Sequence, residues 1–437
     1  MARPLPLFAL LVLLLWLLSL PLLPAAMHRL EPWPLYLQLL NGSGYLAIAL
    51  LSLAMVLGLR LPRLSQWLGG LDRAYQVHRR AAEWGIGLAL FHYLLKLGAG
   101  LARDHGWLEK GRGLGAMRNE LFAGARHLAK ELGEWGLYAG LLLVAIALLR
   151  VIPYRRFAQS HRLLPAVYLL WAFHSLVFMP APLWLSPAGL ALALLLLAGS
   201  GAALWSLAGQ VGRQRQYAAT ITQLEDLGLG VLGVRVKLQA GWPGHDSGQF
   251  ALVTFDSREG AHPFTIASAW HGDGELRFGI KALGDYTREL PRRLKVGDPL
   301  WVEGPYGHFL FDDHKPRQIW IGGGIGMTPF IAKLQQRADE GGQGVPVDLF
   351  YCTSRAEPAI LARLQPLVEA AQVRLHLLDA AKGQQLTATA LCAAVDGWQQ
   401  AGIWFCGPAP FGQQLRQDLL SAGLPADAFH HEAFRFR

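Results

Sequence analysis

Four histidines lie within apolar segments, where ionisable side chains are rare and usually serve a function. His78 and His92 stand 14 residues apart in one segment, and His161 and His174 stand 13 apart in another. On α-helices these spacings measure about 21 Å and 20 Å, so the two pairs cover matched depths. Neutral imidazole nitrogens suit the iron of a porphyrin, and no carboxylates accompany them, so the pattern predicts two b-type haems.

Depth decides which histidines share a haem. His78 pairs with His161 toward one face of the membrane. His92 pairs with His174 toward the other face. On a straight helix, the spacing of 13 residues would make His161 and His174 face in less similar directions than His78 and His92. Pro165 lies between them and can bend or rewind the helix. A single membrane histidine more often makes only an interhelical hydrogen bond, whereas four at matched spacings favour metal ligation.

A second candidate group combines polar, aromatic and hydroxyl side chains directly after an expected strand. It reads His262-Pro263-Phe264-Thr265. These side chains could serve the phosphate, the ring face and a ring nitrogen of one flavin. A plain edge strand that carries a proline is the alternative. Further along the chain, Gly304-Pro305-Tyr306-Gly307 closes the same strand-rich region.

A glycine-rich turn stands between an expected strand and an expected helix. Glycines let the backbone approach a pyrophosphate, and the helix N-terminus offers free N–H groups and the positive end of its dipole. The position of this turn, after a strand-rich region and before an α/β pattern, predicts dinucleotide binding. The turn reads Gly322-Gly323-Gly324-Ile325-Gly326-Met327-Thr328-Pro329.

The elements that must position these residues begin with membrane helices. The 437 residues are 52% hydrophobic and only 16% charged, against the ~25% charged residues usual in soluble domains. This composition excludes a disordered chain, a collagen and a disulfide-stapled scaffold. Six apolar runs are long enough to cross about 30 Å of hydrocarbon as helices. They cover roughly 5–24, 42–61, 78–97, 135–152, 162–180 and 187–210.

Basic residues gather on one side of this arrangement, in the loops 61–80 and 150–162 and after the sixth run. The positive-inside rule makes that side cytoplasmic. We therefore expect a multi-pass protein of the bacterial inner membrane whose soluble half faces the cytoplasm. The same bias accounts for the net charge of +9 without nucleic acid as a partner. The first run could be a cleaved signal peptide, but its length favours a retained helix.

The soluble half shows two patterns in turn. Residues 213–315 read as short strands between glycine turns, which predicts an antiparallel β-barrel domain. Residues 316–437 alternate strands and helices, which predicts an α/β nucleotide-binding domain. Together with an all-α, six-helix transmembrane haem domain over 1–212, these domains make up the predicted fold. Buried strands are expected at 318–321, 347–351, 373–378 and 402–406.

In combination these motifs resemble a known family. The chain is similar to ferric-reductase-type transmembrane cytochromes fused to a ferredoxin-reductase-type module, most closely the bacterial NADPH oxidase-like proteins. The resemblance covers about residue 40 to the end and rests on the histidines and the motifs above. It also rests on Gly284-Asp285-Tyr286-Thr287 and Phe405-Cys406-Gly407-Pro408.

The resemblance implies where the cofactors bind. The segment from His262 to Thr265, with Thr287, would hold FAD. The segment from Gly324 to Pro329 would hold the dinucleotide. Cys406, Gly407 and Pro408 would lie beside the nicotinamide.

Two further roles are expected in the nucleotide-binding domain. Phe434 would stack on the flavin, as the terminal aromatic of related reductases does. Ser354 and Arg355 follow the strand 347–351 and would bind a 2′-phosphate, because arginine clamps phosphate in a bidentate manner. NADPH is therefore expected in preference to NADH, although NADH remains possible as a donor.

The expected activity is transmembrane electron transfer from cytoplasmic NADPH through FAD and two haems to an acceptor on the opposite face. The expected acceptor is O2, which would be reduced to superoxide. One alternative is a ferric-chelate reductase. Another is a haem-containing membrane subunit that delivers electrons to a periplasmic protein. A third is a transporter whose histidines relay protons or bind metal, which the flavin module disfavours.

Two departures from the animal oxidases of this family matter. Their insertions for cytosolic activators are missing, which implies by analogy that no activator is required. Lys96 stands where they carry a histidine, one turn beyond His92. An unpartnered ammonium in a membrane is costly, so Lys96 either reaches the headgroups or stabilises superoxide or a haem propionate beside the haem.

Overall fold

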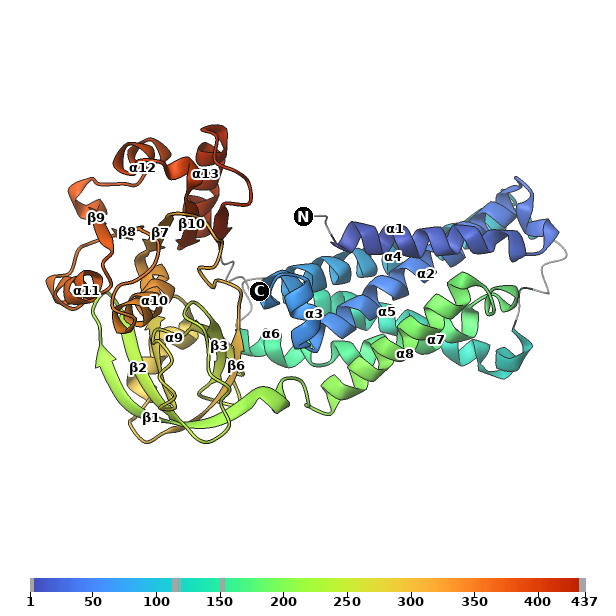
Figure 1. Cartoon of the computed structure of the whole chain (residues 1–437). Coiled ribbons are helices and arrows are strands. Elements are labelled where there is room, and N and C mark those ends of the chain that lie inside the picture. The colour runs from blue at the N-terminus through green and yellow to red at the C-terminus, as the bar shows by residue number, and fades with distance from the viewer. Residues whose placement is uncertain (1–3, 112–116, 118, 150–153, 432–437) are drawn as a thin grey trace. The chain divides into compact units, whose positions relative to one another are not determined.

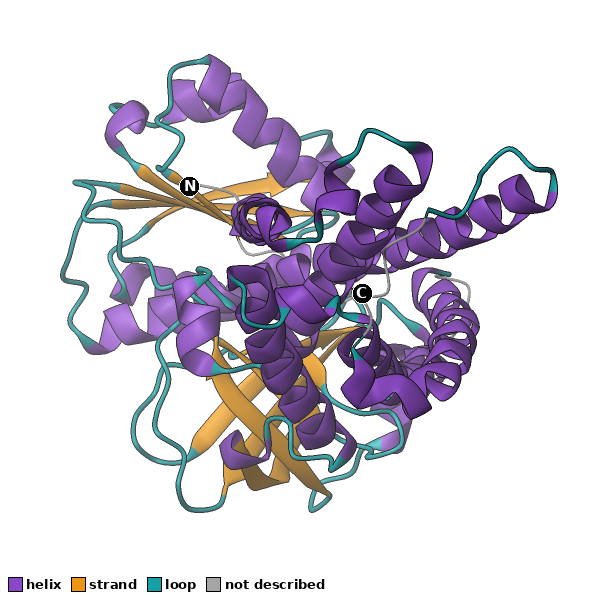
Figure 2. Cartoon of the chain, turned by 90° about the vertical axis from the view of Figure 1, so that its right-hand side faces the viewer, coloured by secondary structure: helices purple, strands orange, loops and turns teal. Residues whose placement is uncertain are grey.

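The computed structural model describes residues 4–111, 117, 119–149 and 154–431 (Figure 1). The chain divides between Gly212 and Arg213 into two compact units. Helices make up the secondary structure that is described for the first unit. The strands of the described residues form two sheets, both in the second unit (Figure 2).

Long apolar helices build the first unit. Leu10, Leu194 and Leu197 are 61%, 68% and 72% exposed, as befits helices that are apolar all round and face lipid. Among the described residues, five helices are long and apolar enough to cross a membrane. They are α1 (Pro4–Ser19, extended by a 3₁₀ turn to Leu22), α2 (Pro32–Gly58), α4 (Leu71–Asp104), α5 (Arg126–Leu148, preceded by a 3₁₀ turn from Glu120) and α8 (Pro187–Leu207).

The expected fifth span, 162–180, is shorter in the structure. α7 (Leu164–Phe178) has 15 residues, about 22 Å at 1.5 Å per residue. A separate short helix, α6 (Tyr154–His161), precedes it. Pro165 lies in the first turn of α7, where a missing N–H is tolerated, so this proline starts a new helix instead of bending a continuous one. The count of six spans is therefore not confirmed.

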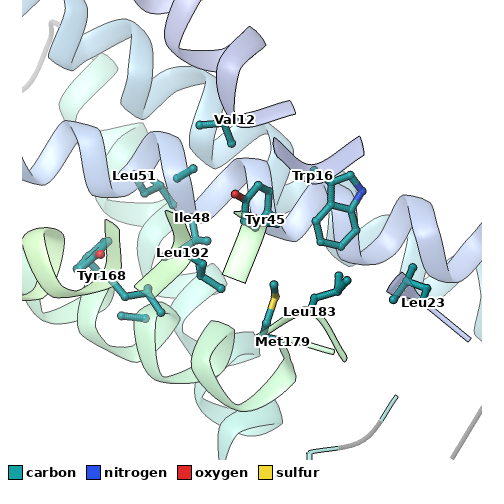
Figure 3. Packing of buried hydrophobic residues seen from close by; sticks show 14 of the residues in the cluster. Val12, Trp16, Leu23, Tyr45, Ile48, Leu51, Tyr168, Met179, Leu183 and Leu192 are labelled. Carbon is teal, nitrogen blue, oxygen red and sulfur yellow. The ribbon is translucent and has the colours of Figure 1, made fainter. Parts of the chain in front are cut away.

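Side chains from neighbouring helices fill the core of the first unit (Figure 3). Trp16 of α1 lies against Tyr45 of α2, with ring centroids 5.2 Å apart. Tyr168 of α7 is buried, and its hydroxyl shares a 2.8 Å hydrogen bond with the hydroxyl of Ser52 in α2. Lipid is as apolar as these side chains, so close packing and interhelical hydrogen bonds stabilise the association of the helices.

The first sheet of the second unit is antiparallel and has the strand order β4-β3-β6-β1-β2-β5. The predicted antiparallel sheet is thus confirmed. One isolated bridge, between Ile266 and Phe278, joins its two edges, so closure into a barrel is not confirmed. The elements are β1 (Gln216–Asp226), β2 (Val231–Leu238), β3 (Phe250–Thr254), β4 (His262–Thr265), β5 (Glu275–Lys281), α9 (Asp285–Arg293) and β6 (Pro299–Tyr306).

The second sheet is parallel throughout, in the order β11-β10-β7-β8-β9. Its four long strands confirm the predicted α/β domain, because each overlaps a segment that the sequence predicted. β11 was not predicted, since three residues near the end of a chain carry little periodicity. The elements are β7 (Gln318–Gly323), α10 (Thr328–Asp339), β8 (Val347–Thr353), α11 (Pro358–Ala370), β9 (Arg374–Asp379), α12 (Ala388–Ala394), β10 (Gly402–Cys406), α13 (Ala409–Ser421) and β11 (Phe429–His431).

Candidate functional site

The helices of the first unit bring the four histidines together in two pairs. We name the pair of His78 and His161 site A, and the pair of His92 and His174 site B. The ring centroids lie 6.1 Å apart in site A and 6.2 Å apart in site B, with interplanar angles of 63° and 88°. α4 supplies one ring to each site. The partner rings come from two different helices, α6 and α7, and not from the single span that the sequence predicted.

The separation of the rings fits one metal ion between them. Two metal–imidazole bonds of about 2 Å each, together with the half-widths of the rings, place linked ring centres about 6 Å apart. Both sites have this spacing. The residues therefore fit bis-imidazole ligation of a haem iron, and haem ligation itself stays a prediction.

Backbone carbonyls set the tautomer of three of the four imidazoles. Nδ1–H of His78 donates to Ala54 O at 2.8 Å. His92 and His174 make equal bonds of 2.8 Å to carbonyls of α2 and α5. A carbonyl oxygen can only accept, so the proton sits on Nδ1 and the lone pair of Nε2 is left for a ligand. Nδ1 of His161 has no hydrogen-bond partner among the described residues.

Aromatic side chains flank the imidazoles that face α4. Phe157 lies 5.2 Å from the ring of His161, and Phe178 lies 4.7 Å from the ring of His174, between centroids. Each phenylalanine stands four residues from its histidine, which places the two side chains on one helix face. The guanidinium of Arg126 lies 4.6 Å from the centroid of Phe178.

Lys96 has a partner that the sequence did not reveal. Its ammonium lies 2.7 Å from Glu134 Oε2, across the α4–α5 interface. The hydroxyls of Tyr93 and Tyr138 donate to the other carboxylate oxygen at 3.0 and 3.1 Å. The premise of an unpartnered ammonium is therefore wrong. Glu134 was overlooked because periodicity does not tell which helices face each other.

The predicted flavin motif forms β4, an edge strand that pairs with β3 alone among the strands of its sheet. Pro263 is compatible with such an edge, where one side of the strand makes no ladder hydrogen bonds. His262 stacks on Tyr286, with centroids 4.4 Å apart and planes inclined by 18°. Burial lowers the pKa of His262 to about 4, so its ring is neutral near pH 7.

Two further residues of the predicted motifs use their hydroxyls within the fold. Thr287 Oγ1 accepts from the backbone N–H groups of Leu283 and Gly284, at 3.1 and 3.0 Å, and so caps α9. Tyr306 is buried, and its hydroxyl donates to Glu303 Oε1 at 2.6 Å. Gly304 and Pro305 lie within β6, which ends at this tyrosine, and Gly307 follows the strand.

The glycine-rich turn packs backbone to backbone against the end of β10. A Cβ on Gly326 would overlap the carbonyl of Cys406, and one on Gly323 would lie 2.8 Å from Pro408 Cδ. Two of the four glycines of the turn, Gly323 and Gly326, are thus required by this close approach. The turn begins with a 3₁₀ segment from Gly324, and α10 starts only at Thr328, whose hydroxyl donates to Ile325 O at 2.6 Å.

Gly324 is the open position of the turn. Its φ of 57° favours glycine, and the single atom within 4 Å of a Cβ built there is Lys281 Nζ, at 3.7 Å. Lys281 ends β5, in the sheet that carries the flavin motif. Sequence reasoning missed this lysine because it is distant in the chain from the turn that it reaches. Its ammonium lies beside the turn that the sequence predicts to bind the dinucleotide.

The remaining predicted residues lie at the carboxyl edge of the parallel sheet. Gly322 is the register partner of Cys406, and Gly323 is that of Cys352, so the ends of β10, β7 and β8 are neighbours. Ser354 and Arg355 follow β8 and are exposed. Ligands of α/β sheets bind at this edge. Gly407 lies against Gly323, and Phe434 lies outside the described residues.

Comparisons with known proteins agree with this arrangement. Residues 43–172 match a family model described as a ferric reductase like transmembrane component, and residues 216–309 match an FAD-binding domain. The fold and these matches define the class of the protein, an NAD(P)H oxidoreductase with a transmembrane domain. The chain matches the fused ferric-reductase-like family in its order of domains, with the transmembrane component followed by a ferredoxin-reductase-type FAD module.

Three similar proteins each match about half of the chain. A ferredoxin–NAD(+) reductase component of an alkene monooxygenase system from Xanthobacter autotrophicus is 27% identical over 234 residues, 50% of this chain and 70% of the relative. A propane 2-monooxygenase reductase component from Mycolicibacterium goodii is also 27% identical, over 43% of this chain and 58% of the relative. The ferredoxin reductase in carbazole 1,9a-dioxygenase is 24% identical, with a TM-score of 0.43 over 50% of this chain and 69% of that structure.

Proposed function

We propose that this protein transfers electrons from NADPH to an acceptor on the opposite face of the membrane, with FAD and two b-type haems as its cofactors. The observation that carries the proposal is the pair of imidazole sites, each with a ring separation that fits one metal ion. An FAD-binding module in the same chain supports it, because such a module supplies the electrons. The domains would be 1–212 for haem, 213–315 for FAD and 316–437 for NAD(P)H.

The first unit would contribute fixed positions and a dry environment. α4 carries His78 and His92 on one unbroken helix, so both sites are anchored to the same rigid element. Haem iron, when bound, exchanges one electron at a time. Neutral Nε2 atoms would hold the iron, and Phe157 and Phe178 would restrict the access of water to the imidazoles.

The second unit would receive the hydride donor. FAD, when bound, accepts a hydride and releases electrons singly, which nicotinamide cannot do. The turn at Gly324 and the ammonium of Lys281 would hold the pyrophosphate of the nucleotide. Arg355 would hold the 2′-phosphate, and the buried end of β10 at Cys406 would lie beside the nicotinamide.

The proposed membrane orientation rests on the basic loops of the sequence. A cytoplasmic second unit would meet cellular NADPH directly, which supports the bacterial inner membrane as the location. In that orientation site A lies toward the cytoplasm and site B toward the acceptor.

Oxygen is the acceptor that we favour, with superoxide as product. No large ligand-binding motif is visible between residues 25 and 41, so a small acceptor fits better than a bulky chelate. Reduction of a ferric chelate is the second candidate, because the transmembrane domain matches a ferric-reductase-like model. An unidentified periplasmic protein would be the third kind of acceptor.

The test is NADPH-driven reduction of cytochrome c by the purified full chain in lipid nanodiscs. We expect two haems and one FAD per chain, and reduction that superoxide dismutase inhibits. Reduction of a ferric chelate that is insensitive to the dismutase would replace oxygen by iron as the acceptor. A purified chain with FAD but without haem would contradict the proposed electron path.

A further inference from the structure

Two imidazoles of α4 donate to carbonyls in the interior of α2. His92 Nδ1–H bonds to Leu40 O, and His78 Nδ1–H bonds to Ala54 O. In an α-helix each carbonyl already accepts the N–H of the residue four places later. Leu40 O also accepts the hydroxyl of Ser43, at 2.9 Å. The imidazole must therefore reach a carbonyl oxygen that already accepts a hydrogen bond within the helix. This oxygen lies close to residue i+4, so a side chain at that position can block the approach.

The third bond of this kind joins α7 to α5. His174 Nδ1–H donates to Ala129 O, at 2.8 Å. Position i+4 is a glycine here as well as in both cases on α2. A Cβ on Gly133 would stand inside van der Waals contact with His174 Nδ1. The three carbonyl and glycine pairs are Leu40 with Gly44, Ala54 with Gly58, and Ala129 with Gly133.

The space available differs between the three glycines. A Cβ on Gly44 would lie 3.0 Å from His92 Nδ1, which is too close for an unstrained contact. A Cβ on Gly58 would lie 3.8 Å from His78 Cε1, an ordinary van der Waals distance. A methyl group would therefore crowd the imidazole at Gly44 and Gly133, which both lie at site B. It would not do so at Gly58.

These glycines oppose the intrinsic stability of their helices. Glycine in a helix interior costs roughly 1 kcal/mol relative to alanine. Two other helical glycines of the first unit do not touch a histidine. Gly87 of α4 would accept a Cβ with no atom within 4 Å, and Gly140 of α5 lies against Trp171. Contact with an imidazole is thus specific to glycines that stand four residues after the accepting carbonyl, and it is not common to all helical glycines.

We propose that Gly44 and Gly133 are positioning residues for the haem ligands of site B. Each leaves a notch at which Nδ1–H of His92 or His174 reaches a carbonyl of the neighbouring helix. The bond orients the ring, keeps Nε2 unprotonated and raises its basicity, which favours ferric over ferrous iron. This inference rests on the proposed haem ligation.

The principal test is Gly44→Ala in the purified full chain. The added methyl pushes the ring of His92 away from Leu40 O and weakens its hydrogen bond. We expect both haems to be retained and the preference of the site B haem for the ferric state to fall about tenfold, a rise in midpoint potential of about 59 mV. A spectroelectrochemical titration measures it, and His78→Ala, which removes the other haem, assigns the potentials.

Two further variants grade the effect. Gly133→Ala, with the tighter contact, should shift the site B potential at least as far or release that haem. Gly58→Ala should leave the site A potential unchanged, because its methyl group has room. A shift of the site A potential in Gly58→Ala equal to that of site B in Gly44→Ala would overturn the steric explanation.

Control variants separate positioning from packing. Gly140→Ala introduces a clash with Trp171 but not with a histidine, and Gly87→Ala introduces none. Neither should move the site B potential, and a shift in Gly140→Ala as large as that in Gly44→Ala would refute the inference. If wild-type protein holds no haem, the proposed function fails first. If it holds two haems whose potentials ignore both Gly44→Ala and Gly133→Ala, only the present inference fails.

Discussion

The two units assemble their candidate sites from different parts of the chain. In the first unit, side chains form the site and the backbone only holds them, as Ala54 holds His78. In the second unit, two backbone segments around Gly326 and Cys406 meet closely, and side chains such as Lys281 stand at the rim. A single substitution can therefore abolish a site of the first kind, whereas at the second kind it adjusts affinity.

The largest effect is expected at the imidazoles. His92→Ala should remove one haem of two and slow NADPH-driven acceptor reduction at least ~100-fold, since even outer-shell partners of a metal ligand contribute 10–100-fold. Reduction of FAD by NADPH should stay unchanged. Haem content by the pyridine haemochrome method and stopped-flow flavin bleaching measure both quantities. His105→Ala, an exposed histidine just beyond α4, is the control, and two haems in His92→Ala would disprove the pairing.

A tenfold change or more is expected at the rim of the nucleotide site. Arg355→Ala should lower kcat/KM for NADPH relative to NADH roughly 10–100-fold, because a charge-assisted hydrogen bond contributes about 1.5–3 kcal/mol. Steady-state kinetics with both nucleotides give the ratio. If the ratio is the same in wild type and variant, Arg355 is only a solvated loop residue.

A comparable but less selective effect is expected from Lys281→Met. Loss of the ammonium beside Gly324 should raise KM about tenfold for NADPH and NADH alike, because both carry the pyrophosphate. Lys295→Met, an exposed lysine of the same unit, should leave KM unchanged. Parallel kinetics of the two variants check this, and equal KM values would remove Lys281 from the site.

The smallest effect is expected at Lys96. Lys96→Met should slow superoxide production a few-fold, because the ammonium would no longer act on the acceptor. Both haem spectra and flavin reduction should stay intact, since a partly exposed ion pair contributes only about 0–1 kcal/mol to stability. Glu134→Gln removes the partner but keeps the ammonium and should not slow production. Equal losses in the two variants would make the ion pair a link between α4 and α5 and nothing more.

Local pattern predicted much of the fold. Long apolar runs predicted the helices α2, α4, α5 and α8, and short apolar runs predicted the strands β7 to β10. Burial imposes these patterns on each segment separately. The run expected at 135–152 starts too late, since residues from Arg126 onward already belong to α5. Polar residues at the start of a long helix gave the mistaken boundary.

Contacts between distant segments could not be read in this way. Spacing placed four histidines at two depths, but it did not reveal the break after His161 or the pairing of Lys96 with Glu134. The carbonyls that receive the imidazoles carry no side-chain signature at all. The glycines four residues further on do mark these carbonyls in the sequence. They can be recognised only when the helix that packs against them is known.

α4 also fixes a distance by residue count. Thirteen residues separate His78 from His92 on an unbroken helix, which sets an axial offset of about 21 Å between the two sites. One inserted residue would swing one imidazole by about 100° and aim it away from its partner. Seven inserted residues would restore the direction to within about 20° but lengthen the offset by about 10 Å. On the proposed electron path, the distance between the two sites can therefore change only in steps of about a helical turn.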